Sequence, residues 1–214
     1  MSRIRAARWA EHAAVTAVIA DALLPSALVE WLVPEATQRG RVVADVAAIW
    51  VEHAFVHGEV YLADGTEGVA AVVVRLHRYR AIPPPEMDGG RVVDAADEHA
   101  AHVALVDALI LSHRPTEPHH HVVCLAVRPS AQGVEWGRAL LDHVCRRMDS
   151  VEAPSWTVVL PGGRDLFASA GYTAGRQFTV PGGQTLCPMR AASGAGGDAR
   201  SAAETAGNRG RMSP

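Results

Sequence analysis

The sequence has little net charge for its length. Twenty Lys and Arg residues stand against 23 Asp and Glu residues, so the formal net charge is −3 and the isoelectric point is near 6.4. A chain without an excess of positive charge has no global field that attracts nucleic acid or an anionic membrane. We therefore expect no nucleic-acid partner, while small charged partners stay open.

Cysteines and long apolar runs are also scarce. Cys124, Cys145 and Cys187 are odd in number and far apart, which disfavours a disulfide framework or a CxxC metal site. Charged residues such as Glu11 and Asp21 interrupt the Ala-rich start of the chain before any secretion signal is complete, and no run reaches the roughly 18 apolar residues of a membrane span. We expect a cytoplasmic protein with reduced thiols and no membrane anchor.

What the sequence does contain is enough apolar residues for one ordinary domain: 214 residues, of which 49% are hydrophobic. Hydrophobic periodicity predicts alternating helices and strands. We expect helices near 10–23, 38–57, 95–112, 137–148 and 164–170, and strands near 3–7, 59–64, 69–76, 119–127, 156–160, 172–180 and 184–189. The residues after Arg190 contain almost no large apolar side chains, which predicts a domain over 1–190 and a disordered tail over 191–214.

The segment LAVRPSAQGVEWGRALL, residues 125–141, reads as a buried strand that leads through a glycine-containing turn into a helix. Such a joint collects unpaired backbone N–H groups and the positive end of a helix dipole at one place. It therefore favours an anion site, although many joints of this kind bind nothing.

The longer string is more specific, because it resembles the acyl-CoA signature of the GNAT superfamily of N-acetyltransferases. In that signature a strand ending in V-x-P is followed by Q/R-x-x-G-x-G/A, and Gln132 to Gly137 occupy the motif here. HRPTEPHHHVVCLAV and GRDLFASAGYT resemble two further blocks of the superfamily, in the order found in actinobacterial, puromycin N-acetyltransferase-like members. The resemblance implies an α/β fold whose mixed, mostly antiparallel sheet is splayed at its middle and flanked by helices.

The resemblance also implies acetyl-CoA as cosubstrate and a small-molecule amine as acceptor, with the chain a monomer or a homodimer. The strand residues Leu125, Ala126 and Val127 would offer backbone groups to the pantetheine arm, which adds to the sheet like another strand. The pyrophosphate would lie on the following turn and helix start, at Gln132, Gly133, Val134, Glu135, Trp136, Gly137 and Arg138. A side chain added at Gly137 is expected to block this site.

Two residues depart from the family pattern. Glu135 stands where the first motif glycine is usual, so its carboxylate either repels pyrophosphate or turns outward and leaves the amides free. Phe167 stands where many members have a tyrosine proposed to protonate the leaving thiolate, and phenylalanine has no proton to give. Both changes are compatible with a specialised enzyme or with a catalytically degenerate member.

An amine can attack the acyl group only when it is uncharged, so the reaction requires a residue that accepts the proton of the amine. Of the three adjacent histidines that begin the strand at 119, His121 resembles a basic position of serotonin N-acetyltransferase-like members and is expected to share a face with Val123 and Leu125. Glu117 is a second candidate base. For both, a merely structural or surface role stays open.

Other candidates carry weaker signals. His53 and His57 have i, i+4 spacing but no third ligand in sequence context, so we expect no metal site. Trp31 and Trp50 could line an acceptor pocket or pack in the core. The sequence therefore predicts an acyl-CoA-dependent N-acyltransferase, with a non-catalytic ligand-binding or interaction module of the same fold as the alternative.

Overall fold

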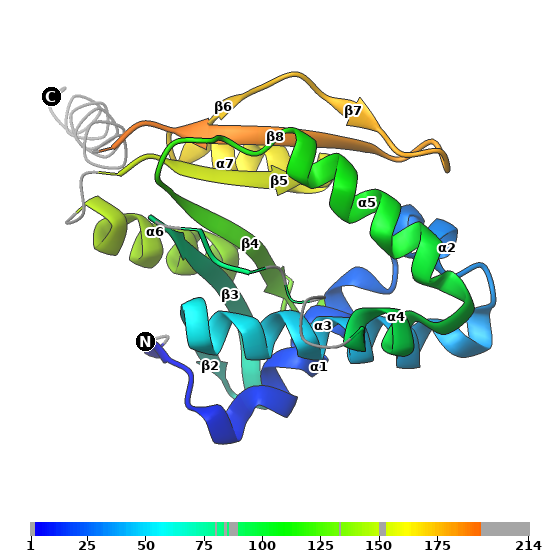
Figure 1. Cartoon of the computed structure of the whole chain (residues 1–214). Coiled ribbons are helices and arrows are strands. Elements are labelled where there is room, and N and C mark those ends of the chain that lie inside the picture. The colour runs from blue at the N-terminus through cyan, green and yellow to red at the C-terminus, as the bar shows by residue number, and fades with distance from the viewer. Residues whose placement is uncertain are drawn as a thin grey trace, which may run out of the picture.

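The computed structural model describes residues 3–79, 81–83, 85, 90–132, 134–149 and 153–193 (Figure 1). The strands are β1 (Arg3–Ala6), β2 (Gly58–Gly65), β3 (Gly68–Arg78), β4 (His119–Val127), β5 (Ser155–Val159), β6 (Thr173–Ala174), β7 (Phe178–Thr179) and β8 (Thr185–Ala191). The helices are α1 (His12–Leu23), α2 (Ala27–Leu32), α3 (Ala36–His57), α4 (Arg91–Ala96), α5 (Ala100–Ser112), α6 (Val134–Asp149) and α7 (Arg164–Ser169).

The strands form one mixed sheet in the order β1-β2-β3-β4-β5-β8-β6, with β7 paired to β8. Every pairing is antiparallel except that of β4 with β5, which is parallel. A parallel pair needs a crossover, and α6 supplies it. The predicted α/β class with a mostly antiparallel sheet is confirmed.

Helices cover both faces of this sheet (Figure 1). One apolar cluster lies between α6, α7 and the sheet, and includes Leu140, Val144, Phe167 and Val122. A second lies on the other face, where α1 and α3 pack against β2, β3 and β4. On that same face α2 and α5 pack over the β7–β8 end of the sheet. The core is therefore two apolar layers separated by the sheet.

Several predicted boundaries differ from the observed ones. Helix α2 was not predicted; it begins after Ser26, whose hydroxyl accepts a hydrogen bond of 3.3 Å from the Val29 N–H. The helix predicted over 95–112 is interrupted at Asp97, which adopts a φ of 53°, and the strand predicted over 172–180 is divided into β6 and β7.

At its C-terminal end the domain extends slightly beyond Arg190. Ala191 is the last residue of β8, pairs with Ser155 and is buried. The predicted tail from residue 194 onward lies outside the described residues. Within the residues that the structure describes, no helix combines the length and the apolar character that crossing a bilayer requires.

Candidate active site

The central feature of the sheet is the separation of β4 from β5. Their ladder contains only His120 with Ser155, His121 with Trp156 and Val122 with Thr157. Beyond Val122, β4 continues to pair with β3, and β5 continues to pair with β8, but the two strands no longer pair with each other. Among the described residues, no strand pairs with the second half of β4 on the side away from β3. This open edge includes Leu125, Ala126 and Val127.

A β-bulge in β4 determines which side chains face this opening. Cys124 pairs with Val74 and Val122 pairs with Arg75, so Val123 has no partner of its own in β3. Val123 and Cys124 both pack toward α1 and α3, whereas Leu125 lies on the opposite face against α6. The expectation that His121 shares a face with Leu125 is therefore wrong, because the bulge reverses the alternation between them.

The three histidines at the start of β4 do not converge. His119 and His121 lie on the α1–α3 face with ring centroids 6.4 Å apart. His120 lies on the other face, where its Nδ1 is 2.7 Å from the Tyr79 hydroxyl and 3.2 Å from an Arg75 nitrogen. Burial and the Arg75 charge lower the pKa of His120 to about 3, so this histidine is neutral and belongs to a structural polar cluster.

A cavity of about 300 Å³ lies on the α1–α3 face, beside the point where β4 and β5 separate. Both diverging strands line it, with Val123 and Cys124 from β4 and Val158 from β5. Apolar side chains of α1, α2, α3 and α5 form most of the remaining wall, and Trp50 is one of them. A cavity of this size and character is typical of small-molecule sites.

His121 lines this cavity and is 7% exposed. Its ring lies 4.8 Å from the Trp156 ring, and its Nδ1 is 3.5 Å from Arg78 Nε, which is the outer limit of a hydrogen bond. Burial is the largest cause that holds the pKa of His121 well below 6.5, and the Arg78, His119 and Arg114 charges act in the same direction. His121 is therefore uncharged at neutral pH, with a lone pair on one ring nitrogen.

Three charged residues that were not predicted from the sequence as site residues also line the cavity. They are Arg78 at the end of β3, Asp107 in α5 and Arg114 after α5. Only Asp107 carried a usable signal, because it is the one acidic residue in the apolar sequence of α5. Arg114 lies within the block HRPTEPHHHVVCLAV but has no distinguishing pattern around it, and Arg78 is distant in sequence and reaches the cavity through the pairing of β3 with β4.

The start of α6 lies directly after β4 and a short 3-10 turn at Pro129–Ala131. Arg128 fixes this junction, because its guanidinium donates to Asp21 of α1 at 2.8 Å and to the Val69 carbonyl at 2.9 Å. Gln132 is exposed. Gly133 and the side chain of Val134 lie outside the described residues.

Glu135, in the first turn of α6, has an exposed side chain. Of the two orientations considered from the sequence, exposure favours the outward one, in which the carboxylate is solvated and the backbone amides of the helix start are not covered by it. Trp136 is half-buried and packs against the apolar cluster between α6, α7 and the sheet.

Gly137 lies at the contact of α6 with the sheet and α7, a packing role that was not predicted from the sequence. A Cβ at this position would lie 3.2 Å from Leu166 Cδ2, 3.4 Å from Leu125 Cδ2 and 3.6 Å from Val127 Cγ2. The residue therefore faces the sheet and α7, and the expectation that a side chain here blocks the anion site stays a prediction. Arg138 bonds Asp142 at 3.0 Å and Ser169 at 2.8 Å, so its guanidinium ties α6 to α7.

Phe167 is 4% exposed and packs edge-on against Tyr172, with ring centroids 5.1 Å apart. It belongs to the apolar cluster between α6, α7 and the sheet. The hydroxyl groups of Tyr172 and Ser155 form a hydrogen bond of 2.6 Å.

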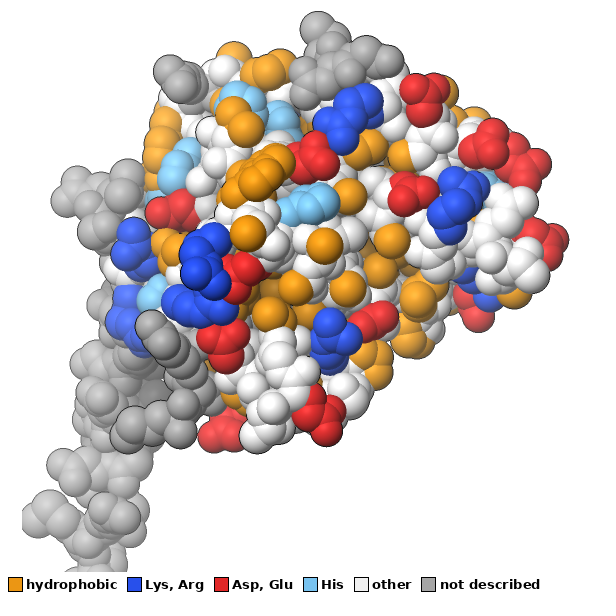
Figure 2. All heavy atoms as spheres, turned by 90° about the horizontal axis from the view of Figure 1, so that it is seen from below, with side chains coloured by type: hydrophobic (Ala, Val, Ile, Leu, Met, Phe, Trp, Pro, Cys, Tyr) orange, Lys and Arg blue, Asp and Glu red, His pale blue; other side chains and the backbone are white. Residues whose placement is uncertain are grey.

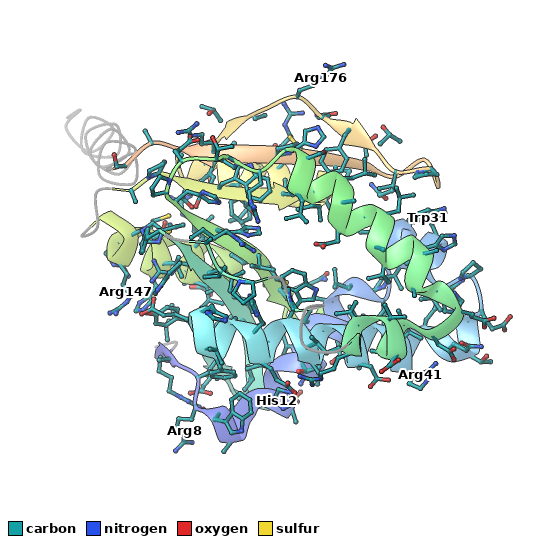
Figure 3. The ribbon with its side chains drawn as sticks, in the orientation of Figure 1. Arg8, His12, Trp31, Arg41, Arg147 and Arg176 are labelled. Atoms are coloured by element: carbon teal, nitrogen blue, oxygen red, sulfur yellow. The ribbon has the colours of Figure 1, made fainter. Side chains whose placement is uncertain are left out.

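The remaining candidates lie away from the cavity or in its wall. Glu117 pairs with Arg190 at 2.5 Å and does not line the cavity. Trp31 stacks on His102 at 4.6 Å, and in Figure 3 it lies at the outer end of the α2–α5 region. His53 and His57 have ring centroids 4.6 Å apart. No group of three His, Cys, Asp or Glu side chains that could hold a metal ion occurs within the described part of the chain.

The surface shows no face-wide excess of one charge in the view of Figure 2, where arginine and acidic side chains are interspersed among apolar ones. This distribution agrees with the small net charge of the sequence.

Comparison with known proteins gives similarity in structure only. No family model matches the sequence, and no curated protein matches it. A structure from Corynebacterium glutamicum, described as histone acetyltransferase HPA2 and related acetyltransferase, is similar with a TM-score of 0.66 and 15% identity, over 90% of this chain and 96% of that one. Arylalkylamine N-acetyltransferase 2 from Aedes aegypti is similar with a TM-score of 0.61 and 11% identity, over 89% and 98%.

A GCN5-related N-acetyltransferase from Rhodopseudomonas palustris is also similar, with a TM-score of 0.54 and 13% identity, over 90% of this chain and 96% of that one. At these identities the comparison concerns the fold. The sheet order, the separation of β4 from β5 and these similarities together show that the chain has the fold of the GNAT acetyltransferases.

Proposed function

We propose that this protein is an acyl-CoA-dependent N-acyltransferase that transfers an acetyl group to the amine of a small molecule. The observation that carries the proposal is the unpaired edge of β4 beside a cavity that contains a neutral histidine. If the pantetheine arm of acetyl-CoA adds along that edge, its thioester would lie where Val123, Cys124 and Val158 line the cavity. An acceptor in the cavity would then meet it at the sheet.

The residues present fit acetyl-CoA, which when bound supplies an acetyl group activated as a thioester. Backbone groups of Leu125, Ala126 and Val127 would hold the pantetheine arm, since the β4 ladder leaves that edge without a strand. The amides from Gln132 to Arg138 would hold the pyrophosphate at the start of α6, and the Glu135 side chain is exposed there.

His121 is the proposed proton acceptor. It is neutral and buried in the cavity wall, so it can take the proton that the amine loses as its nitrogen bonds to the acyl carbon and the carbon–sulfur bond breaks. Arginine only donates hydrogen bonds, so the Arg78 contact at Nδ1 favours the tautomer protonated at Nε2. At 3.5 Å this contact is weak, so it gives the tautomer protonated at Nε2 only a small preference over the one protonated at Nδ1.

The experiment is thiol release from acetyl-CoA with a panel of primary amines. We expect release that depends on both the protein and the amine, with one acetylated amine formed for each thiol. All 20 basic residues of the chain are arginine, so no lysine of the protein itself competes as an acceptor. Absence of both thiol release and CoA binding would overturn the proposal.

Phe167 favours the second candidate, a GNAT-fold protein that binds a ligand without acyl transfer. Its buried ring has no hydroxyl to protonate a leaving thiolate. CoA binding by the wild-type protein without thiol release, together with release by Phe167→Tyr, would show a site that is assembled but lacks its proton donor. The affiliation to the puromycin N-acetyltransferase-like branch and the cytoplasmic location stay predictions.

A further inference from the structure

The charges around the cavity are unevenly placed. The face of α5 that lines it carries Val103, Val106, Asp107, Ile110 and Leu111, and the same face continues to Arg114 beyond the helix end. These positions follow helical spacing, so the face carries apolar residues and one carboxylate, that of Asp107, and a guanidinium follows at its C-terminal end.

Arg78 and Arg114 both lie near His121. Arg78 Nε is 3.5 Å from His121 Nδ1, and all three residues line the same cavity. The charges of both arginines lower the pKa of His121, which agrees with their proximity. Arg78 and Arg114 bring two guanidiniums to the described cavity wall, and Asp107 brings one carboxylate.

The Arg114 guanidinium has no ion pair with any residue in the described ranges, although its backbone N–H donates to the Leu111 carbonyl at 3.1 Å. It is half-buried. A guanidinium at the wall of a mostly apolar cavity is well placed to bind a carboxylate, because it can donate two parallel hydrogen bonds to the two carboxylate oxygens.

We propose that the acceptor is an apolar α-amino acid, or a compound that likewise carries a carboxylate next to its reacting amine on a large apolar body. This inference rests on the proposed function. The amine has to reach His121, and the two guanidiniums lie at that same end of the cavity, so an anionic group on the adjacent carbon would be bound there. The apolar side chain would occupy the part of the cavity lined by α1, α3 and α5.

The same positive charge helps the chemistry. A guanidinium near an amine destabilises its ammonium form, just as it destabilises protonated His121. An amine without a carboxylate would meet this repulsion with no compensating contact, whereas an amino acid would retain binding through its carboxylate.

The test compares matched pairs that differ only in the carboxylate: L-phenylalanine with 2-phenylethylamine, and L-leucine with 3-methylbutylamine. Binding to the full chain is measured by calorimetry without CoA, and thiol release is then measured with acetyl-CoA. We expect each amino acid to bind at least about tenfold more tightly than its decarboxylated partner. Arg114→Gln should remove most of this difference, whereas the matched control Arg176→Gln, whose side chain points away from the molecule in Figure 3, should preserve it.

The outcomes separate the two proposals. Amino-acid binding with the expected preference but without thiol release supports this inference and contradicts acyl transfer. Thiol release with a preference for the decarboxylated amines supports acyl transfer and overturns this inference. Binding of neither member of a pair overturns the inference as well, and if Arg114→Gln does not fold, the wild-type preference alone decides.

Discussion

At the residue scale, Glu135 is the sharpest departure from the GNAT motif, and its exposure limits its effect. A solvated carboxylate near pyrophosphate should weaken CoA binding by at most about 1 kcal/mol, roughly fivefold in Kd. We expect Glu135→Gln and Glu135→Gly to tighten binding by similar small factors in calorimetry, and added salt to reduce the difference from wild type.

The two substitutions differ in what they change. Gln removes the charge and keeps a side chain, whereas Gly also lets the backbone approach the ligand more closely. A gain for Glu135→Gly of tenfold or more beyond that for Glu135→Gln would show that the side chain, and not its charge, obstructs the site. That result would contradict the outward orientation described above.

His121 is the residue whose ionisation should be visible in the pH dependence of the reaction. Its pKa is held well below 6.5, so it stays neutral throughout the range from about 6.5 to 9. We expect kcat/KM to rise with pH as the amine acceptor itself deprotonates, with no inflection near 6.5. His121→Asn should lower kcat about 100-fold, which is the usual order for losing a general base. An inflection near 6.5 that disappears in His121→Asn would contradict the environment assigned to this histidine.

At the scale of the element, α6 depends on a glycine for its contact with the sheet. Gly137→Ala would bring a Cβ within 3.2 Å of a flexible leucine terminus, and it also gains helix propensity, so we expect a stability change within about 1 kcal/mol. Gly137→Asp would place a carboxylate among Leu125, Val127 and Leu166 and should destabilise the fold by about 2–4 kcal/mol.

Denaturant unfolding of both variants, beside wild type, measures this difference. If Gly137→Asp is as stable as wild type, the glycine does not face the sheet. Loss of CoA binding in that variant is informative about the site only when the fold is shown to be intact.

The elements themselves were largely predictable from the sequence, because hydrophobic period and turn residues are local signals. The long helix α3, the β2–β3 hairpin and the strand–turn–helix unit of β4 and α6 appear near their predicted positions. Helix α2 is only six residues long and follows Pro25, so it spans fewer than two turns and shows no repeated amphipathic pattern. The bulge at Val123 was not predictable, since it depends on pairing with β3 and leaves no pattern in the sequence of β4 alone.

The candidate site was predictable only where it is continuous in sequence. The resemblance identified β4, the start of α6 and His121, all within one segment of the chain. Arg78 comes to the cavity from a separate segment, whereas Arg114 precedes β4 in the same segment as His121, and nothing in their immediate neighbours distinguishes either from a surface arginine. The apolar wall contributed by α1, α3 and α5 follows from tertiary packing.

At the scale of the whole molecule, buried neutral histidines make the fold sensitive to acid. The pKa values of His119, His120 and His121 are all lowered by burial, that of His120 to about 3. As the pH falls below 6.5, the unfolded chain therefore binds protons that these folded-state histidines bind only at lower pH, near 3 for His120, so stability falls as the pH falls. Each contributes at most about 1.4 kcal/mol per pH unit.

We expect the Tm to fall steadily from pH 6.5 to pH 4.5, a window above the usual titration of carboxylates. Replacing His120 with Gln should make that fall shallower. A Tm independent of pH across this window would contradict the burial of the three histidines in a neutral state.

The separation of β4 from β5 is the property of the whole sheet on which the proposed function depends, and hydrogen–deuterium exchange with saturating CoA tests it most directly. We predict slower exchange in peptides that contain Leu125 to Val127 and the start of α6, because ligand groups would pair with the backbone groups of β4 that face away from β3 and are not paired with β5. Peptides limited to His120–Val122, which already pair with strands on both sides, should change little. Unchanged exchange along Leu125 to Val127, or protection confined to α5, would contradict the account.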